Sequence, residues 1–507
     1  MFNYVINALK FILKTIIVLF LVYLQIMYIW PLFNLDYSYL NLTSILYTFQ
    51  FICIFIIGNK KYDNEFNILW LISIIVFPII FIPIYLFSVY VRSNIIKKFE
   101  KNNSISTNVE QNDINEKIFE EDKQIYNIGK FIENACNTNF RFCDKYIYYP
   151  TGNNFFSDFI YDLKNAKKYI FINFFILSKG VMWEDIKDIL IKKMNSGVKV
   201  YIIFDHLGSF TSYPRDIKKI KHNNFHLKIY NTLLSGIGPY INSRNHRKII
   251  VIDGEIGFIG GINIADEYIN NGKFKYKWKD TAIRFNGKIV NDLTNMFIKI
   301  WNDISTNDKL NINDFIVRND IIVKDNGYLI LYSDRLYNKY YTSKNVYLQC
   351  INIAKKYVYI MTPYLILDEE FTNTLIRASR SGVDIRIITP KKPDNIFVHT
   401  VTRTYYTKLL EAGISIYEYS LGFIHAKNML IDDEIAIVGS QNFDFRSMYM
   451  LLENGILAYK IKEIDKIKND FINTFKQSEK IELEKWKKRS IFVKIGESIL
   501  KIFAPLL

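Results

Sequence analysis

The sequence predicts an α/β protein made of two similar lobes, preceded by a hydrophobic N-terminal region. Three observations lead to this expectation. Strand and helix patterns alternate through residues 141–485, a histidine motif occurs twice within them, and long uncharged stretches are confined to the first 92 residues. Strands that alternate with helices indicate a layered α/β fold, and a repeated pattern indicates a duplicated unit.

The composition indicates anionic partners. The chain has 507 residues, enough for two or three domains, and its formal net charge is +15. Such an excess of positive charge favours nucleic acid or the phosphate headgroups of a membrane surface. Half of the residues are hydrophobic, which is high for a soluble enzyme of this size. The four cysteines show no paired spacing, so neither a disulfide framework nor a zinc site is predicted.

Three uncharged apolar stretches near the N-terminus are predicted to cross a membrane. Residues 68–91 carry no charge and can span a hydrocarbon layer of about 30 Å as a helix, with Pro78 and Pro83 tolerated inside it. Residues 15–34 and 37–58 are also uncharged, but the second of these is more polar, so two or three spans are expected. No small-residue cleavage site follows the stretch at 15–34, which disfavours a signal peptide there.

Positive residues beside these stretches favour a cytoplasmic location for the rest of the chain. Arg92, Lys97, Lys98 and Lys101 after the last stretch favour this location. Lys60 and Lys61 draw the loop before that stretch to the same side, so the charges give a preference and not a topology. We expect the following organisation: a transmembrane anchor in residues 1–92, a linker in 93–140, one lobe in 141–310, a second lobe in 311–485 and an amphipathic tail in 486–507. The tail would either lie in the membrane interface or pack on the core.

The second lobe repeats the pattern of the first. The segment NAKKYIFINFFI (165–176) matches IAKKYVYIMTPYLI (353–366), and SGVKVYIIFD (196–205) matches SGVDIRIITP (381–390). The matching segments follow one another in the same order, which argues for duplication. In each copy we expect a strand, a helix, a second strand and then a strand pair.

The elements of the first copy can be placed from residue types and spacing. Short β-branched and aromatic runs predict strands at 169–177 and 198–205, and the apolar spacing of 182–197 predicts a helix between them. The segment KIIVIDGEIGFIGG predicts a hairpin that turns at Asp253 and Gly254. Its counterpart NMLIDDEIAIVGS predicts a hairpin that turns at Asp432 and Asp433.

The repeated motif contains a histidine, a lysine and an aspartate at fixed spacing. NSRNHRKIIVIDG holds His246, Lys248 and Asp253, and GFIHAKNMLIDD holds the second set, which is His425, Lys427 and Asp432. On a strand, residues i and i+2 project to the same face, so each histidine is expected beside its lysine. A lysine attracts a phosphate, and an imidazole can attack phosphorus or move protons.

Further residues of the motif fit a phosphate. GGIN and GSQN follow the two hairpins, and their Asn263 and Asn442 can donate hydrogen bonds to phosphate oxygens. Asp253 and Asp432 are included among the candidate catalytic residues, although Asp is also favoured at hairpin turns. They would either orient the histidines or shape the turns.

Two histidines can divide the chemistry of one phosphodiester transfer. One attacks phosphorus while neutral, and the other gives a proton to the leaving alcohol and takes one from the incoming alcohol or water. A single copy of the motif cannot supply both roles. The duplication therefore predicts one site that uses both copies.

These motifs resemble the phospholipase D superfamily, and most closely its bacterial cardiolipin synthases. The resemblance rests on RNHRKIIVIDG with GGINIADEY, KWKDTAIRFNG, TPYLI, GFIHAKNMLIDD with GSQNFDFRS, and the closing APLL. It implies two phospholipase D-type lobes, each a mixed β-sheet flanked by helices, with the active site at their interface. It also aligns Glu453 with an acidic residue of the family, two residues after Leu451, where family members often have asparagine.

The resemblance further implies a reaction without metal or other cofactor. A phosphatidyl group would move from one phosphatidylglycerol to a histidine and then to a second phosphatidylglycerol, with release of glycerol. His246 would be the nucleophile and His425 the acid and base, with phosphate bound by Lys248, Lys427, Asn263 and Asn442. The implied partners are phosphatidylglycerol and anionic membrane lipid rather than nucleic acid, and the implied location is the bacterial cell membrane. A phospholipase D-type hydrolase, a transferase that uses another acceptor alcohol, a nuclease and a non-enzymatic membrane scaffold remain as alternatives.

Overall fold

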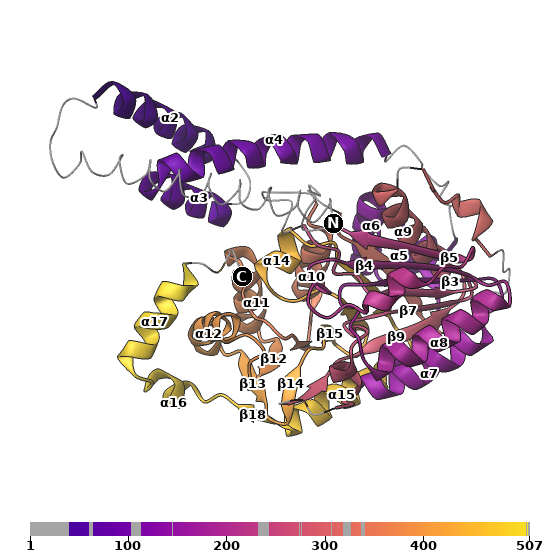
Figure 1. Cartoon of the computed structure of the whole chain (residues 1–507). Coiled ribbons are helices and arrows are strands. Elements are labelled where there is room, and N and C mark those ends of the chain that lie inside the picture. Colours follow the sequence, from indigo (N-terminus) through magenta and orange to yellow (C-terminus); the bar gives the residue numbers. More distant parts are fainter. Residues whose placement is uncertain are drawn as a thin grey trace. The chain divides into compact units, whose positions relative to one another are not determined.

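The structure is a computed structural model that describes residues 40–59, 64–102, 113–143, 145–231, 243–272, 274, 276–305, 307–317, 326–335, 340–502 and 504 (Figure 1). It divides into two units. The first comprises residues 1–97 with 238–240, and the second comprises residues 98–237 with 241–507. Both predicted lobes belong to the second unit except for residues 238–240.

The described part of the first unit consists of three apolar helices. They are α2 (Leu40–Gly58), α3 (Asn64–Val76) and α4 (Pro78–Asn102). Cys53, Ile57, Ile74, Ile82 and Tyr85 form a small buried cluster between them. The helices thus have a common core of their own.

The predicted membrane span at 68–91 is not one continuous helix. It is divided between α3 and α4 at Phe77, because Pro78 lacks an N–H and disfavours helical geometry in the residue before it. Among the residues that the structure describes, no helix combines the length and apolar character needed to cross a membrane. The predicted span at 15–34 lies outside the described residues.

The first lobe contains a mixed β-sheet in the order β2-β9-β7-β6-β3-β4-β5. Its strands are β2 (Tyr146–Tyr149), β3 (Tyr169–Phe174), β4 (Lys199–Asp205), β5 (Phe225–Tyr230), β6 (Ile249–Ile252), β7 (Ile256–Gly260) and β9 (Ala282–Asn286). β3, β4 and β5 are parallel, and the remaining pairs are antiparallel. Its helices are α7 (Gly152–Asn165), α8 (Val181–Asn195) and α9 (Ile289–Ile304), with short 3₁₀ turns η2 (Arg215–Lys219), η4 (Asp266–Ile269) and η5 (Ile312–Asp314).

The second lobe contains a sheet in the order β1-β10-β17-β16-β15-β11-β12-β13-β18. Its strands are β1 (Arg141–Phe142), β10 (Tyr328–Ser333), β11 (Tyr357–Met361), β12 (Asp384–Pro390), β13 (Ser415–Tyr419), β15 (Asn428–Ile431), β16 (Ile435–Gly439), β17 (Asn454–Tyr459) and β18 (Ser478–Lys480). Its helices are α10 (Thr342–Ile353), α11 (Glu369–Arg380), α12 (Ile396–Thr404), α13 (Tyr406–Glu411), α14 (Phe445–Tyr449) and α15 (Ile464–Lys476), followed by α16 (Leu483–Lys487) and α17 (Ile491–Lys501).

The two sheets share one topology, which confirms the prediction of two similar α/β lobes. From β2 to β5 in the first sheet and from β10 to β13 in the second, the order and the parallel or antiparallel sense of the pairs agree. The predicted strands at 169–177 and 198–205 and the helix between them are present as β3, β4 and α8. Both predicted hairpins are present, with positive φ at Asp253, Gly254, Asp432 and Asp433.

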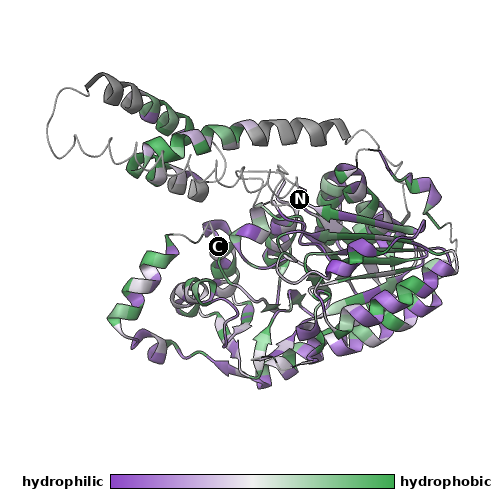
Figure 2. Cartoon of the chain, in the orientation of Figure 1, coloured by the Kyte–Doolittle hydropathy of each residue, from purple (hydrophilic) through white to green (hydrophobic). Residues whose placement is uncertain are grey.

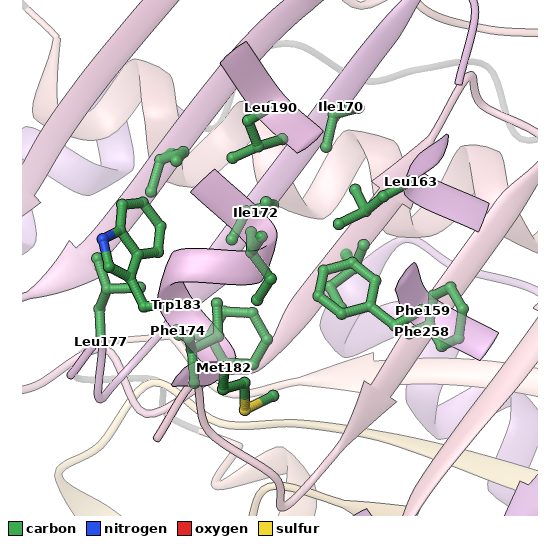
Figure 3. Close-up of a cluster of buried hydrophobic side chains, with 14 of the residues drawn as sticks. Phe159, Leu163, Ile170, Ile172, Phe174, Leu177, Met182, Trp183, Leu190 and Phe258 are labelled. Atoms are coloured by element: carbon green, nitrogen blue, oxygen red, sulfur yellow. The ribbon is translucent and has the colours of Figure 1, made fainter. Parts of the chain in front are cut away.

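Apolar packing between helices and sheet fixes the first lobe. Trp183 and Met182 of α8 and Phe159 and Leu163 of α7 are buried against the sheet, with Phe258 of β7 (Figure 3). Burial of large aromatic and aliphatic side chains is the main source of such stability. The strands of the first lobe are therefore held by closely packed helices.

The segment predicted as a linker is partly folded onto the second lobe. It contains α5 (Asp113–Glu121) and α6 (Lys123–Cys136), and α6 buries Ile125, Ile128 and Ile132 while packing on α10 and β10. The apolar residues recur at helical spacing, which outweighs the polar composition of the segment. β1, at the start of the predicted first lobe, pairs with β10 of the second lobe.

Candidate functional site

The two histidine segments lie at the junction of the lobes. His246 and Lys248 immediately precede β6, and His425 and Lys427 immediately precede β15. The prediction placed each pair within a strand, whereas the structure places it in the extended residues before one. The difference arises because these residues pair with the opposite lobe instead of continuing the sheet of their own lobe.

Main-chain hydrogen bonds cross between the lobes at both segments. His246 N donates to Leu452 O at 2.9 Å, and Leu452 N donates to Arg244 O at 2.8 Å. In the other copy, β14 (Gly422–Ile424) pairs in parallel with β8 (Lys277–Lys279) of the first lobe, and His425 N donates to Lys279 O at 2.7 Å. Each histidine is thus attached to the lobe that does not contain it.

Leu452 and Lys279, which accept these hydrogen bonds from the histidines, are each followed by an acidic residue. Its buried carboxylate binds the ring of the same histidine. Nδ1 of His246 lies 2.8 Å from Oε1 and 3.0 Å from Oε2 of Glu453, which is fully buried. An ionised carboxylate can only accept, so Nδ1 carries the proton and Nε2 keeps the lone pair. Hydroxyls of Ser447 and Ser440 donate to the same carboxylate at 2.8 Å and 2.5 Å. Glu453 therefore fixes both the ring orientation and the tautomer of His246.

The second histidine has an equivalent partner with different support. Nδ1 of His425 lies 2.5 Å from Oδ2 of the buried Asp280, whose Oδ1 accepts from Thr281 N at 2.7 Å. A Cβ on Gly261 would lie 2.2 Å from Oδ1 of Asp280. Gly261 occupies the position that Ser440 occupies in the other lobe, since both follow the last glycine of the returning strand. The glycine leaves room for the shorter carboxylate.

Aromatic rings flank both histidines. Phe175 meets the His246 ring edge to face at 4.9 Å between centroids. Tyr268 and Trp278 approach the His425 ring at 5.4 Å and 5.5 Å. The rings exclude water from the sides of the imidazoles and limit their rotation.

Each lysine is anchored to the backbone of its own histidine. Lys248 Nζ donates to His246 O at 2.7 Å, and Lys427 Nζ donates to His425 O. Burial lowers the pKa of Lys248 to about 7 and that of Lys427 to about 8. A bound anion would favour the charged form of both.

Electrostatic interactions join the two halves into one site. Burial lowers the pKa of His246 well below its ordinary value, and the charges of Lys248 and Lys427 act in the same direction. The pKa of His425 is also lowered by burial, with contributions from both lysines and from His246. Arg446 adds a further positive charge near His246. An anion placed between the histidines would therefore meet positive charge from both lobes.

The two predicted asparagines bond to residues that are linked to the histidines. Asn263 donates to Tyr268 OH at 2.7 Å and accepts from Ile176 N at 3.1 Å, and Tyr268 packs on the His425 ring. The backbone N–H of Asn442 donates to Ser447, which supports Glu453. Both side chains are buried.

The carboxylates of Asp253 and Asp432 bind backbone N–H groups beside their hairpin turns. Asp253 accepts hydrogen bonds from the N–H groups of Lys167, Lys168 and Tyr169 at 2.6–3.0 Å. Asp432 accepts from the equivalent N–H groups of residues 355–357 at 2.6–2.8 Å. Each carboxylate ties a hairpin turn to the start of the neighbouring strand, while the Nδ1 atoms of the histidines bind other carboxylates. Of the two readings that the sequence left open, the structure supports the shaping of the turn.

Sequence reasoning missed the role of Asp280 and assigned none to Glu453. Asp280 lies in the quoted motif KWKDTAIRFNG, whereas Glu453 lies six residues beyond GSQNFDFRS and was noted only through the family resemblance. A usable signal was their similar place in the repeat, where each lies one or two residues before the strand that pairs with the returning strand of the hairpin. Among the residues that the structure describes, no group of His, Cys, Asp and Glu is arranged to hold a metal ion.

Comparison with known proteins agrees with the duplicated site. The family described as "Cardiolipin synthase, PLD-like domain" matches residues 159–301 and 347–475, once in each lobe. The crystal structure of phosphatidylserine synthase from Haemophilus influenzae Rd KW20 superimposes with a TM-score of 0.56 at 13% identity, covering 74% of this chain and 97% of that chain. That similarity supports the two-lobe fold.

Proteins that are similar in sequence identify the family more closely. An uncharacterized protein of Streptococcus mutans is 35% identical, covering 89% of this chain and 98% of the relative. Cardiolipin synthase 2 of Staphylococcus epidermidis is 36% identical, covering 71% of this chain and 74% of the relative. Cardiolipin synthase of Geobacillus kaustophilus is 32% identical, covering 70% and 71%. The chain belongs to the phospholipase D superfamily and, within it, to the family of cardiolipin synthase-type phosphatidyltransferases, as the sequence motifs predicted.

Proposed function

We propose that this protein synthesises cardiolipin by transferring a phosphatidyl group from one phosphatidylglycerol to another, with release of glycerol. The observation that carries the proposal is the pair of buried histidines, each bonded through Nδ1 to a carboxylate of the opposite lobe. This arrangement leaves Nε2 of both rings for chemistry on one phosphodiester. The names of the cardiolipin synthase relatives supply the substrate class.

In the first step, Nε2 of neutral His246 attacks phosphorus and forms a P–N bond. The bond from phosphorus to the glycerol oxygen breaks, and that oxygen takes the proton from Nε2 of His425. Burial opposes the imidazolium form of His425, whereas the carboxylate of Asp280 and the charge of the incoming phosphodiester favour it. Lys248, Lys427, Asn263 and Asn442 are the proposed ligands of the phosphate oxygens.

In the second step, a hydroxyl of another phosphatidylglycerol gives its proton to Nε2 of His425. Its oxygen attacks phosphorus, and the P–N bond to His246 breaks to give cardiolipin. Water in place of this hydroxyl would give phosphatidic acid, and a different alcohol would give a different lipid. The aromatic rings around His425 disfavour free access of water and so support lipid as the acceptor.

We further propose that the N-terminal unit attaches the enzyme to the cytoplasmic face of a bacterial membrane. Phe51 and Phe55 on α2 are 69% and 63% exposed, and Tyr90 on α4 is 65% exposed. Large apolar side chains in such number favour contact with lipid over contact with water. Attachment keeps the site at the surface where phosphatidylglycerol resides.

The test uses purified full-length enzyme in vesicles that contain phosphatidylglycerol, with a chelator present. Formation of cardiolipin and glycerol in equal amounts is expected. Formation of phosphatidic acid with glycerol would instead show a hydrolase, and a requirement for added metal would contradict the mechanism. Addition of free glycerol or ethanolamine as competing acceptors measures the preference for the lipid hydroxyl.

The covalent step can be tested separately. Labelled phosphatidylglycerol, followed by rapid acid-free denaturation and peptide mapping, should locate the phosphatidyl group on His246. Retention of configuration at phosphorus is expected, because two inversions cancel. Inversion would exclude a phosphohistidine intermediate.

A further inference from the structure

The C-terminal helix α17 turns its apolar side chains outward. Phe492 is 82% exposed, Ile491 is 60% exposed, Ile499 is 55% exposed and Ile495 is 50% exposed. Positions 492, 495 and 499 lie on one side of a helix. In Figure 2 the helix is coloured largely as hydrophobic, yet that side packs against no described part of the second unit.

The opposite side of α17 carries a buried carboxylate. Glu497 is only 7% exposed, and its two carboxylate oxygens accept from the guanidinium of Arg489 at 2.5 Å and 3.1 Å. Lys494 Nζ donates to Lys487 O at 2.7 Å. A helix that buries its one carboxylate and exposes Ile and Phe is the reverse of an ordinary surface helix.

α17 is held on the second lobe at a defined place. α16 buries Trp486, whose ring centroid lies 3.4 Å from the guanidinium carbon of Arg489 and 4.8 Å from that of Arg403. α17 itself packs along α12. The outward face is therefore a fixed feature of the lobe, and α12 adds two more exposed apolar residues at its start, Ile396 at 68% and Phe397 at 60%.

We propose that α17 and the start of α12 form a docking surface for an anionic lipid bilayer, with the apolar face of α17 inserted among the headgroups. The exposed residues Lys487, which pairs with Glu411, and Lys488, which lies between α16 and α17, supply the complementary charge. Helices that combine an apolar face with flanking lysines lie in the membrane interface at a depth of about 5–10 Å. The sequence left open whether residues 486–507 lie in the membrane interface or pack on the core. In this proposal α17 does both, because one of its sides packs on the lobe and the other contacts the bilayer.

The docking surface connects to the candidate site. Asp394, which directly precedes the N-cap of α12, accepts a hydrogen bond from Tyr364 OH, and its charge raises the pKa of Lys427 in the site. Leu421, 56% exposed, directly precedes the strand β14 that leads to His425. A bilayer against this surface would present lipid headgroups beside the site. The role given to the surface therefore rests on the proposed function.

Binding at this surface can be measured without turnover. Full-length protein with Phe492→Cys carries an environment-sensitive fluorophore, and Lys192→Cys on the exposed side of α8 serves as the matched control. The native cysteines of the described residues are buried, and unlabelled wild type corrects for any background. With vesicles of phosphatidylglycerol and phosphatidylcholine, the label at 492 should shift to the blue and lose roughly half its emission to quenchers at shallow depth in the lipid. The label at 192 should do neither.

Several outcomes would overturn the docking surface. The label at 492 could resist the lipid quenchers, or it could shift without vesicles as protein concentration rises, which would assign the face to a second copy of the chain. Equal insertion into vesicles of phosphatidylcholine alone would remove the anionic requirement.

A pair of triple variants tests the apolar face itself. Phe492, Ile495 and Ile499 are replaced together by serine in one protein and by leucine in the other. The leucine protein should retain insertion, reported by a fluorophore at Ile491→Cys, and the serine protein should lose it. If α17 inserts but no cardiolipin forms, the docking surface stands and the proposed function is wrong. If cardiolipin forms while α17 stays outside the bilayer, the proposed function stands and the docking surface is wrong.

Discussion

The two histidine–carboxylate pairs occupy equivalent places in the repeat but differ in what supports them. Glu453 is held by two serine hydroxyls and orients His246, whereas Asp280 fits beside Gly261 and orients His425. The crossing between lobes is the same in both. Duplication has thus kept the scaffold that brings the rings together, while the surroundings of each ring have diverged, as expected when the two histidines perform different steps.

The largest expected effect comes from the histidines themselves. His246→Ala and His425→Ala should each reduce cardiolipin formation by about 10⁴-fold or more, because nucleophile and proton donor are both required. The proteins should differ with a phosphatidyl nitrophenol substrate, whose leaving group needs no proton. His425→Ala should still release about one nitrophenol per site, measured as a burst of absorbance, and His246→Ala should release none.

The reverse pattern in that assay would exchange the roles of the two histidines. Circular dichroism and thermal unfolding of both variants control for loss of fold. A burst from both variants would show that neither ring is the nucleophile.

The carboxylates should give the next largest effect. Glu453→Gln and Asp280→Asn keep the shape of each side chain but remove the charge that fixes the histidine tautomer, so turnover should fall by about 10²–10⁴-fold. KM for phosphatidylglycerol should change little, because neither carboxylate is placed to contact the lipid. A rise in KM with unchanged kcat would contradict this positioning role.

The dependence on pH follows from the same burial. Burial raises the pKa of Glu453 and of Asp280 to about 7, so both carboxylates lose their charge as pH falls through that value. The lysines lose theirs as pH rises through about 7 for Lys248 and about 8 for Lys427. A plot of kcat/KM against pH should therefore fall on both sides of a maximum between these values. Glu453→Gln should make the acidic side less steep, because only Asp280 still titrates there.

The residues around the carboxylates test why the pairs differ. Gly261→Ala should displace Asp280, because the added Cβ would lie 2.2 Å from its Oδ1, and a loss of about 100-fold in kcat is expected if the bond to His425 is broken. Ser440→Gly removes one hydrogen bond to Glu453 but adds no clash, so a loss of about tenfold is expected. Equal effects of the two variants on kcat would mean that the close approach at Gly261 is unimportant.

Local patterns made much of this fold predictable. Apolar periodicity located β3, α8 and β4, and the hairpin turns were placed correctly because aspartate and glycine tolerate positive φ. The paired histidines were likewise evident from spacing. These features depend on residues close together in the chain.

Contacts between the lobes were not predictable in the same way. Asp280 and Glu453 are 145 and 207 residues from the histidines that they bind, and no local pattern reports such pairing. Spacing placed Asp253 and Asp432 in the repeated motif but could not show that their carboxylates bind the backbone N–H groups of a neighbouring strand. The break at Phe77 was signalled by Pro78, but length and apolar content alone favoured one continuous span.

The smallest expected effect on catalysis comes from Asp253 and Asp432, and it separates motif membership from chemistry. Asp253→Ala leaves three backbone N–H groups at the start of β3 without their acceptor. Each hydrogen bond to a charged group contributes about 1.5–3 kcal/mol, so the melting temperature should fall clearly. Asp432→Ala, in its more exposed turn, should destabilise less. Below the melting transition, kcat of both variants should stay within about tenfold of wild type, since neither carboxylate touches a histidine. A loss of kcat as large as that of Glu453→Gln, in protein shown to be folded, would return these aspartates to the catalytic set.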